Sequence, residues 1–364
     1  MSNLRDVARH ANVSLGTASA VYTGSRGVST AARGKVLTAA AALGYEARPR
    51  SAARAGSVVL ISHCESLNAS RAHEHDGDIV QGILDACEGT HRHITYVQIT
   101  GENAAGLLVR ERSRARRAFL FLNVAPAWTR EALHHRRAGQ VPVILGDRGL
   151  AHRYDSVVSD DVSSMQSIAT RLVSEGEQHF ILLRGPQEYT AFRDRYTTAT
   201  ATLAQLLRGP HTLRSVDCRD GFEAGAAAAS AVLGSCGTGH ATILAAHDMQ
   251  ALGLLSKLRQ LGVSVPRDLS VMGWDDILPA RACAPPLTTV HVPRNLLGRV
   301  AAHLASDRLL HTDGDAHAPV TLTVTCSFAE RGSTRPRARA PRRAAPFQVP
   351  PPPRSSRPTF RKKG

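Results

Sequence analysis

LRDVARHANVSLGTASAVYTGSRGVSTAARGKVLTAAAALGYEARPR, residues Leu4–Arg50, is the stretch that decides the fold of the amino-terminal part of the chain. Its apolar residues recur at three- and four-residue steps, the spacing that puts side chains on one face of a helix. Three short helices are predicted, with buried faces formed by Leu4, Val7, Ala8 and Ala11, by Ala18, Val21 and Tyr22, and by Val36, Leu37, Ala40 and Leu43.

Polar residues and glycines mark the ends of these helices. Asn12 is expected to take a tight turn, Ser14 to cap the second helix, and Ser29 to cap the third, which ends near Gly44. Two short helices around a tight turn, with a third covering the same core, indicate a helix-turn-helix domain.

Short motifs along this stretch are DVA at 6–8, NVS at 12–14, T-x-S at 17–19, Gly24, VS at 28–29, R-x-KV at 33–36 and LGY at 43–45. In this order and spacing they resemble the headpiece of the lactose-repressor (LacI/GalR) family. The resemblance implies a DNA-binding transcriptional regulator whose second helix enters the major groove.

The resemblance also implies which residues meet DNA: Ser14, Thr17 and Ser19 at phosphates, Leu15, Gly16 and Ala20 at base edges, with Arg33 of the third helix and Arg54 of the hinge beside them. Leu15, Gly16 and Ala20 depart from the family, because none of them can make the bidentate hydrogen bonds that distinguish guanine or adenine. Either thymine methyls and DNA shape supply the sequence choice, or the headpiece binds DNA with little sequence choice.

The segment Arg48–Gly56 corresponds to the family hinge, which becomes a short helix in the minor groove when a dimer binds DNA. Arg54 stands where the family usually has a leucine wedge. An arginine suits a narrow minor groove, although an ordinary basic linker is an equal alternative.

Charge gathers at the two ends of the chain, whose net charge is +15. Residues 1–57 hold eight basic and two acidic side chains, and residues 333–364 hold ten basic and none acidic, which leaves 27 basic and 28 acidic residues between them. DNA affinity is therefore expected at the ends, with a Pro- and Arg-rich disordered tail over 333–364.

Beyond Ser57, apolar runs such as SVVLISH, VPVILGD, HFILLRGP and ATILAAHD alternate with amphipathic stretches. This alternation predicts two doubly wound parallel-sheet α/β subdomains. By the resemblance, they form a core like that of periplasmic binding proteins. The expected domains are a headpiece with hinge over 1–57, a core over 58–332 with chain crossings near 160, at 288–293 and after 310, and the tail.

Ligands of open α/β sheets bind beyond the carboxyl ends of strands, here a cleft between the subdomains. The resemblance implies six effector-binding candidates: His75, Asp76, Asp147, Arg195, His247 and Asp275. Structural ion pairs are the alternative for Arg195 and Asp275. His247 replaces a usual asparagine, and His75 with Asp76 replaces a usual aromatic pair. A sugar phosphate or an acid is therefore expected to fit better than a plain hexose, unless the site has no effector.

Other functions have little support in the sequence. The run His73-Glu74-His75-Asp76 has neighbours too close together to converge on one metal ion, and six scattered cysteines form no C-x-x-C pair. No catalytic motif is present, so neither an enzyme nor a cofactor is expected. No apolar run is long enough for a membrane span or a signal core, which predicts a cytoplasmic protein. The family resemblance implies a nucleoid-associated homodimer that binds double-stranded DNA.

Overall fold

The computed structural model describes residues 4–23, 28–45, 57–63, 72–88, 94–99, 117–136, 139–236, 239–311 and 317–335. The headpiece consists of helices α1 (Leu4–His10), α2 (Leu15–Thr23) and α3 (Thr30–Ala42). Their shared core is made of small apolar side chains: Val7, Ala8, Ala11, Ala18, Val21, Val36, Ala39 and Ala40. The three-helix prediction is confirmed.

The predicted turn and caps of the headpiece are confirmed. Asn12 has a positive φ of 51°, a conformation that asparagine tolerates better than most residues. The Ser14 Oγ atom accepts a hydrogen bond from the Thr17 amide at 3.0 Å, and Ser29 Oγ accepts one from the Ala32 amide at 3.2 Å. Both serines therefore satisfy backbone donors that a helix leaves unpaired at its start.

One predicted core residue of the headpiece is wrong. Leu37 is 49% exposed, whereas Val36 and Ala40 are buried and Leu43 packs against the same core. The buried face of α3 follows positions 36, 39, 40 and 43, and Leu37 lies one residue, about 100° of helix rotation, beyond it.

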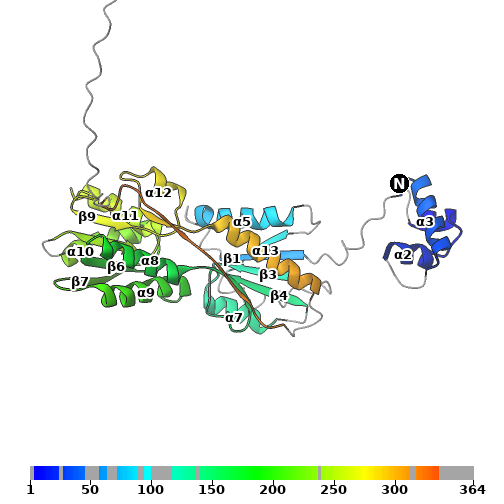
Figure 1. Ribbon diagram of the computed structural model, residues 1–364, viewed down its shortest axis with the longest axis horizontal. Helices are drawn as coiled ribbons and strands as arrows, with labels where there is room; N and C mark the ends of the chain where they lie inside the picture. The colour runs from blue at the N-terminus through cyan, green and yellow to red at the C-terminus, as the bar shows by residue number, and fades with distance from the viewer. Residues whose placement is uncertain are drawn as a thin grey trace, which may run out of the picture.

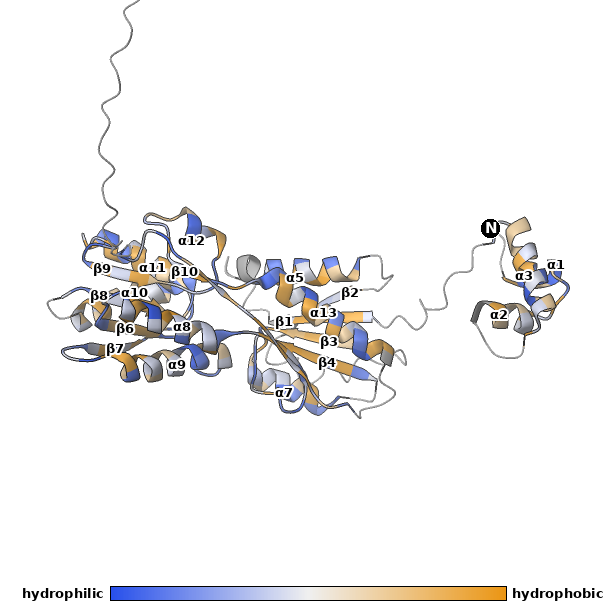
Figure 2. Cartoon of the chain, in the orientation of Figure 1, coloured by the Kyte–Doolittle hydropathy of each residue, from blue (hydrophilic) through white to orange (hydrophobic). Residues whose placement is uncertain are grey.

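The core begins with a parallel sheet in the order β11-β5-β4-β3-β1-β2 (Figure 1). Its strands are β1 (Ser57–His63), β2 (Ile94–Ile99), β3 (Arg117–Leu122), β4 (Gln140–Leu145), β5 (Asp155–Ser159) and β11 (Thr321–Val324). Helices α5 (Ala72–Cys87), α7 (Pro126–His134) and α13 (Arg294–His311) cover it. In Figure 2, β1, β3 and β4 are coloured hydrophobic along much of their length, as expected for strands covered on both faces.

The second subdomain has a parallel sheet in the order β7-β6-β8-β9. Its strands are β6 (His179–Arg184), β7 (Thr212–Asp217), β8 (Ala241–Ala245) and β9 (Leu269–Met272). Its helices are α8 (Asp161–Ser174), α9 (Thr190–Leu206), α10 (Phe222–Ser235), α11 (Asp248–Gln260) and α12 (Leu278–Ala282). The predicted fold class, two parallel α/β subdomains behind a helical headpiece, is confirmed.

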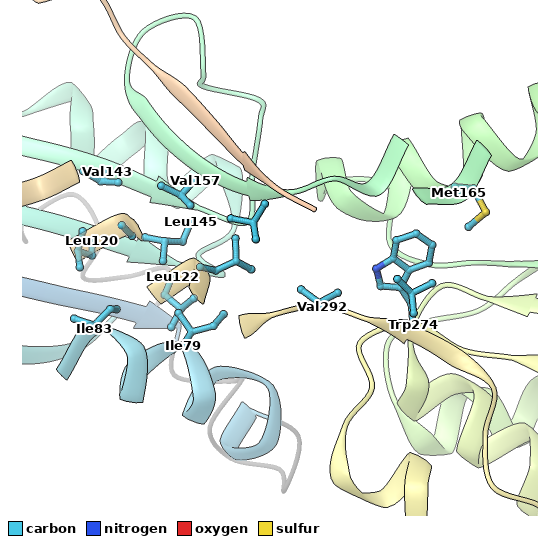
Figure 3. Packing of buried hydrophobic residues seen from close by; sticks show 14 of the residues in the cluster. Ile79, Ile83, Leu120, Leu122, Val143, Leu145, Val157, Met165, Trp274 and Val292 are labelled. Carbon is cyan, nitrogen blue, oxygen red and sulfur yellow. The ribbon is translucent and has the colours of Figure 1, made fainter. Parts of the chain in front are cut away.

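The chain passes between the subdomains three times: from β5 into α8, from β10 (Thr289–His291) into α13, and from β11 into β12 (Ser327–Ala329). Strands β10 and β12 pair antiparallel in these crossings. Figure 3 shows Val292 of the second crossing between Leu122 and Leu145 on one side and Trp274 on the other. All four side chains belong to one buried cluster, so apolar packing runs from one subdomain into the other.

The expected boundary at 332 falls too early. Ser333 is fully buried, its hydroxyl donates to the Val271 carbonyl at 2.6 Å, and it accepts from the Thr288 amide at 2.8 Å. The Arg335 amide donates to Ser270. Residues 333–335 therefore belong to the core, and the rest of the predicted tail lies outside the described residues.

Two further differences concern the second subdomain. The sequence pattern predicts no strand at β7, because TLRSVD is an edge strand in which only Val216 is buried and so lacks the apolar run of the others. The sequence pattern predicts a helix around Tyr196 to Leu207, whereas α9 begins earlier, at Thr190.

Within the part of the chain that the structure describes, no helix has both the length and the apolar character needed to cross a bilayer.

Helices α5 and α13 cross at reciprocal glycine contacts. A Cβ atom added to Gly82 would lie 2.0 Å from the Asn295 carbonyl oxygen, and one added to Gly298 would lie 2.0 Å from the Ile79 carbonyl oxygen. These distances are far below van der Waals contact, so the two helix backbones meet where only glycine fits.

We expect Gly298→Ala to lower the free energy of unfolding by about 1 to 3 kcal/mol, because the helices must move apart. Gly234→Ala, in α10, is the matched control, since a Cβ there meets nothing within 4 Å and alanine favours the helix. Urea unfolding of both variants measures the difference. Equal stability of the two would show that the packing of α5 on α13 is not tight.

Candidate functional site

The exposed face of α2 carries the residues expected to meet DNA. Leu15 is 43% exposed and Gly16 is exposed, while Ser19 and Ala20 are partly exposed. This face therefore offers no long polar side chain to a base edge. Arg33 is exposed on α3, and Arg54 lies outside the described residues.

The hydroxyls of Ser14 and Thr17, at the start of α2, are hydrogen-bonded to each other. Ser14 Oγ lies 2.9 Å from Thr17 Oγ1 and already accepts the Thr17 amide. Either hydroxyl can be the donor of the bond between them, because a hydroxyl that accepts one hydrogen bond can still accept a second. The geometry thus assigns Ser14 a capping role, and phosphate contacts of Ser14 and Thr17 stay predictions.

Polar side chains from both subdomains gather where the strands end. We call this region the inter-subdomain junction and define it by Asp76, Asn123, Asp147, Asp161, Thr190, Arg195, Asp220, His247 and Asp275. The Arg148 amide, next to Asp147, donates to Thr190 Oγ1 at 2.9 Å and so joins the end of β4 to the start of α9. This contact brings the two strand edges together, as the rule for open α/β sheets predicts.

The first subdomain contributes two buried carboxylates. Asp76, at the start of α5, accepts from Asn123 Nδ2 at 2.5 Å, and Asn123 follows β3. Asp147, after β4, is 8% exposed, and its Oδ1 accepts from the Gly149 amide at 2.5 Å. Its Oδ2 atom is buried and receives no hydrogen bond from the described residues. A buried acceptor without a donor is costly unless a ligand or water supplies one.

The second subdomain is organised around Arg195, which is 7% exposed. Its Nε donates to Asp161 at 3.1 Å, and its Nη1 donates to the Ala246 carbonyl at 2.8 Å. Its Nη2 lies 3.9 Å from Asp275, and the guanidinium stacks 4.6 Å from the Trp274 ring centroid. Arg195 and Asp275 are therefore at least partly structural, and a role in effector binding stays a prediction.

Asp161 was absent from the sequence-based candidates although it is the second aspartate of the VSDD run. Burial raises the pKa of Asp161, and the neighbouring Arg195 offsets part of that rise.

Asp275 adopts a φ of 113°, which an aspartate rarely does. Such strain is more common at functional sites than elsewhere.

His247 caps α11 with its ring, because Nδ1 accepts from the Met249 amide at 3.1 Å. Its other nitrogen, Nε2, contacts the carboxylate of Asp220. Asp220 was also missed, since it follows β7, the strand that the sequence did not reveal. The His75 side chain lies outside the described part, so the pairing of His75 with Asp76 is untested.

No group of three or more metal-ligating side chains is found among the described residues.

The fold and the junction together define a class of protein: a helix-turn-helix headpiece joined to an α/β core that carries polar groups between two subdomains. A family model described as "Bacterial regulatory proteins, lacI family" matches residues 3–47, and one described as "Periplasmic binding protein-like domain" matches residues 169–334. The chain therefore combines a lacI-family DNA-binding headpiece with a periplasmic binding protein-like core.

Curated relatives match over nearly the whole chain. The HTH-type transcriptional regulator MalR of Streptomyces coelicolor is 29% identical over 92% of this chain and 96% of its own length. The ribose operon repressor of Haemophilus influenzae is 25% identical over 91% and 98%. Both names are those of regulators, not enzymes.

Solved structures of the same fold agree. A complex of the transcriptional regulator CelR with cellobiose has a TM-score of 0.63 at 25% identity, covering 92% of this chain and 100% of that one. The lac repressor dimer bound to operator and an anti-inducer has a TM-score of 0.62 at 22% identity, covering 92% and 99%. The likeness to the lac repressor dimer, at 22% identity, shows only that the two chains share a fold.

Asp248, fully buried beside the junction, allows a test of the electrostatics. It accepts from the Ile277 amide at 3.0 Å and from Thr289 Oγ1 at 2.5 Å. Burial, followed by repulsion from Asp275, raises the pKa of Asp248 well above its ordinary value. Ionisation of Asp248 is therefore unfavourable in the folded state.

The pH dependence of stability follows from this rise. The contribution of Asp248 is complete below the ordinary aspartate pKa of about 3.9 and is lost as pH rises through the higher folded-state pKa. Asp248→Asn cannot ionise, so we expect the stability of wild type relative to this variant to fall between about pH 4 and the raised pKa. Urea unfolding of both proteins across this range measures the difference; a constant or growing difference would contradict the assignment.

Proposed function

We propose that this protein is a homodimeric repressor that binds a pseudo-palindromic operator through two headpieces and releases or retains it according to a small polar effector at the inter-subdomain junction. The observation that carries the proposal is the capped, exposed face of α2 on a three-helix headpiece, joined to a two-subdomain core. A two-fold dimer matches the two-fold symmetry of such an operator. We place the regulator in the cytoplasm beside the nucleoid, where this DNA lies.

The effector is proposed to be carbohydrate-like. Support comes from the polar side chains at the strand ends, and from related proteins whose names or complexes include ribose and cellobiose. Closing the subdomains around such a ligand would move the first subdomain relative to the second and change the spacing of the two hinges. Effector binding and DNA affinity would then be coupled reciprocally.

A second candidate, an architectural DNA-binding protein with little sequence choice, is favoured by one observation. Leu15, Gly16 and Ala20 present no bidentate hydrogen-bonding group on the exposed face of α2. Thymine methyl contacts and DNA shape are the alternatives by which the same face could still select a sequence.

Selection of bound sites from a random duplex pool at near-physiological salt separates these two functions, because non-specific affinity is largely suppressed there. We expect enrichment of a two-fold symmetric motif with A·T pairs opposite Leu15 and Ala20. Thr17→Val should weaken binding to all sites about equally, since it removes a phosphate contact. Binding only at low salt, with no enriched motif, would favour the architectural protein.

The basic segment 336–364 holds nine Lys and Arg residues and no acidic residue. If it contacts DNA, removing it should flatten the dependence of log affinity on log salt, by up to about 0.9 for each phosphate that the segment neutralises. Residues 333–335 stay in the shortened protein, because they are part of the core. An unchanged slope would assign the segment no role in DNA binding.

A further inference from the structure

The inter-subdomain junction is rich in hydrogen-bond acceptors. Four of its carboxylates, Asp76, Asp147, Asp220 and Asp275, belong to side chains at strand ends or helix starts. Ionised carboxylates only accept hydrogen bonds, so their partners must be donors. The buried Oδ2 of Asp147, which no described donor reaches, points independently to a ligand that donates a hydrogen bond there.

Donors for an anionic ligand are scarce by comparison. The guanidinium of Arg195 is directed to Asp161, Asp275 and the Ala246 carbonyl, and its charge is matched by those two carboxylates. The Arg148 Nη2 atom donates to the Ser159 carbonyl at 3.0 Å. A phosphate or carboxylate placed in the junction would meet mainly like charge, which disfavours anionic effectors.

Asp220 is the most exposed of these carboxylates, and the His247 ring contacts it. Because Nδ1 of His247 accepts the Met249 amide, the ring proton lies on Nε2, the nitrogen that contacts the Asp220 carboxylate. The Asp220 side chain is 55% exposed, so part of the carboxylate remains accessible to a ligand.

Aromatic rings lie next to this pair. The Phe192 ring is 5.7 Å from the His247 ring, and Tyr189 packs against Phe192 edge to face at 6.1 Å. Phe192 is held in place because it covers Gly185, where a Cβ atom would lie 2.7 Å from the ring. A carboxylate beside aromatic faces is the combination that binds protonated amines, through an ion pair and cation–π attraction.

We propose that the effector carries a protonated amino group alongside hydroxyls, as in an amino sugar or an aminated polyol, and that Asp220 selects the amine. The proposal rests on the effector site proposed above and narrows its ligand. It replaces the sugar phosphate or acid that the sequence favoured. In this arrangement the hydroxyls of the ligand donate to Asp147, and the ammonium group lies between Asp220 and the Phe192 ring.

The test uses full-length protein and matched sets of sugars. Each set contains a neutral sugar, its 2-amino derivative and its 6-phosphate, for glucose, galactose and mannose; cellobiose is paired with the disaccharide of glucosamine. Calorimetry is expected to show at least one amine binding about fivefold tighter than its neutral parent or more, with the phosphates weaker than both. The proposal is overturned if no amine exceeds its parent, or if a phosphate binds tightest.

Substitution of Asp220 tests whether this residue selects the amine. Asp220→Asn should bring the ratio of amine to parent affinity close to one, whereas Glu223→Gln should keep it. Glu223 carries the same charge, is exposed like Asp220 and lies three residues away on α10, so it controls for long-range electrostatics. A ratio that Asp220→Asn leaves unchanged removes Asp220 as the selecting residue.

Wild-type protein supplies a measurement that does not depend on the folding of a variant. Raising KCl should weaken binding of the amine more than binding of its parent, because salt screens an ion pair at a half-exposed carboxylate. Equal salt dependence would overturn the ion pair. The outcome is independent of the DNA selection, which is done without ligand: an operator motif without amine binding would refute this inference alone.

Discussion

The ion pair between Arg195 and Asp161 is the interaction on which the geometry of the junction depends. Both side chains are at least nine-tenths buried, and they come from the start of α8 and the first turns of α9. Two buried charges are costly unless they are paired and hydrogen-bonded, so each fixes the position of the other. Through its remaining donors Arg195 also fixes the ends of β8 and β9, at Ala246 and Asp275.

A second arginine connects this site with the first subdomain. Arg294, buried at the start of α13, donates to the Asp275 carbonyl and, through Nη2, to Asp78 of α5 at 3.0 Å. Helix α13 meets α5 at the glycine contacts of Gly82 and Gly298, so the two helix backbones are in direct contact. Movement of Asp275 on ligand binding would therefore reach α5 through one guanidinium and a rigid helix pair. The three chain crossings would also restrict the directions in which one subdomain can rotate relative to the other.

Much of this could be predicted from the sequence, for a definite physical reason. Strands covered on both faces need apolar side chains throughout, so β1, β4, β6 and β8 stand out, and helix caps need short polar side chains, as at Ser14 and Ser29. Strand β7 was not predicted because the side chains of an edge strand can remain polar, and Asp220, which follows β7, was missed for the same reason. Leu37 was placed in the core because a leucine in a helix suggests burial, although small alanines fill that core instead. The contact of Ser333 with Val271 joins residues 62 positions apart, and no local pattern reports such a contact.

The distribution of charge would explain how one chain could bind both DNA and the proposed amine-bearing effector, two ligands of opposite charge. The first 57 residues carry a net positive charge, whereas the core between the basic ends is close to neutral overall and concentrates carboxylates at the junction. DNA phosphates are thus attracted to the headpiece and find no attraction at the effector site, while a cationic or donor-rich ligand meets the reverse. The Debye length at physiological salt is about 8 Å, so each field acts on its own ligand with little direct influence on the other. Coupling between the headpiece and the proposed effector site would then be mechanical, through the buried arginines and the α5–α13 pair, rather than through long-range electrostatics.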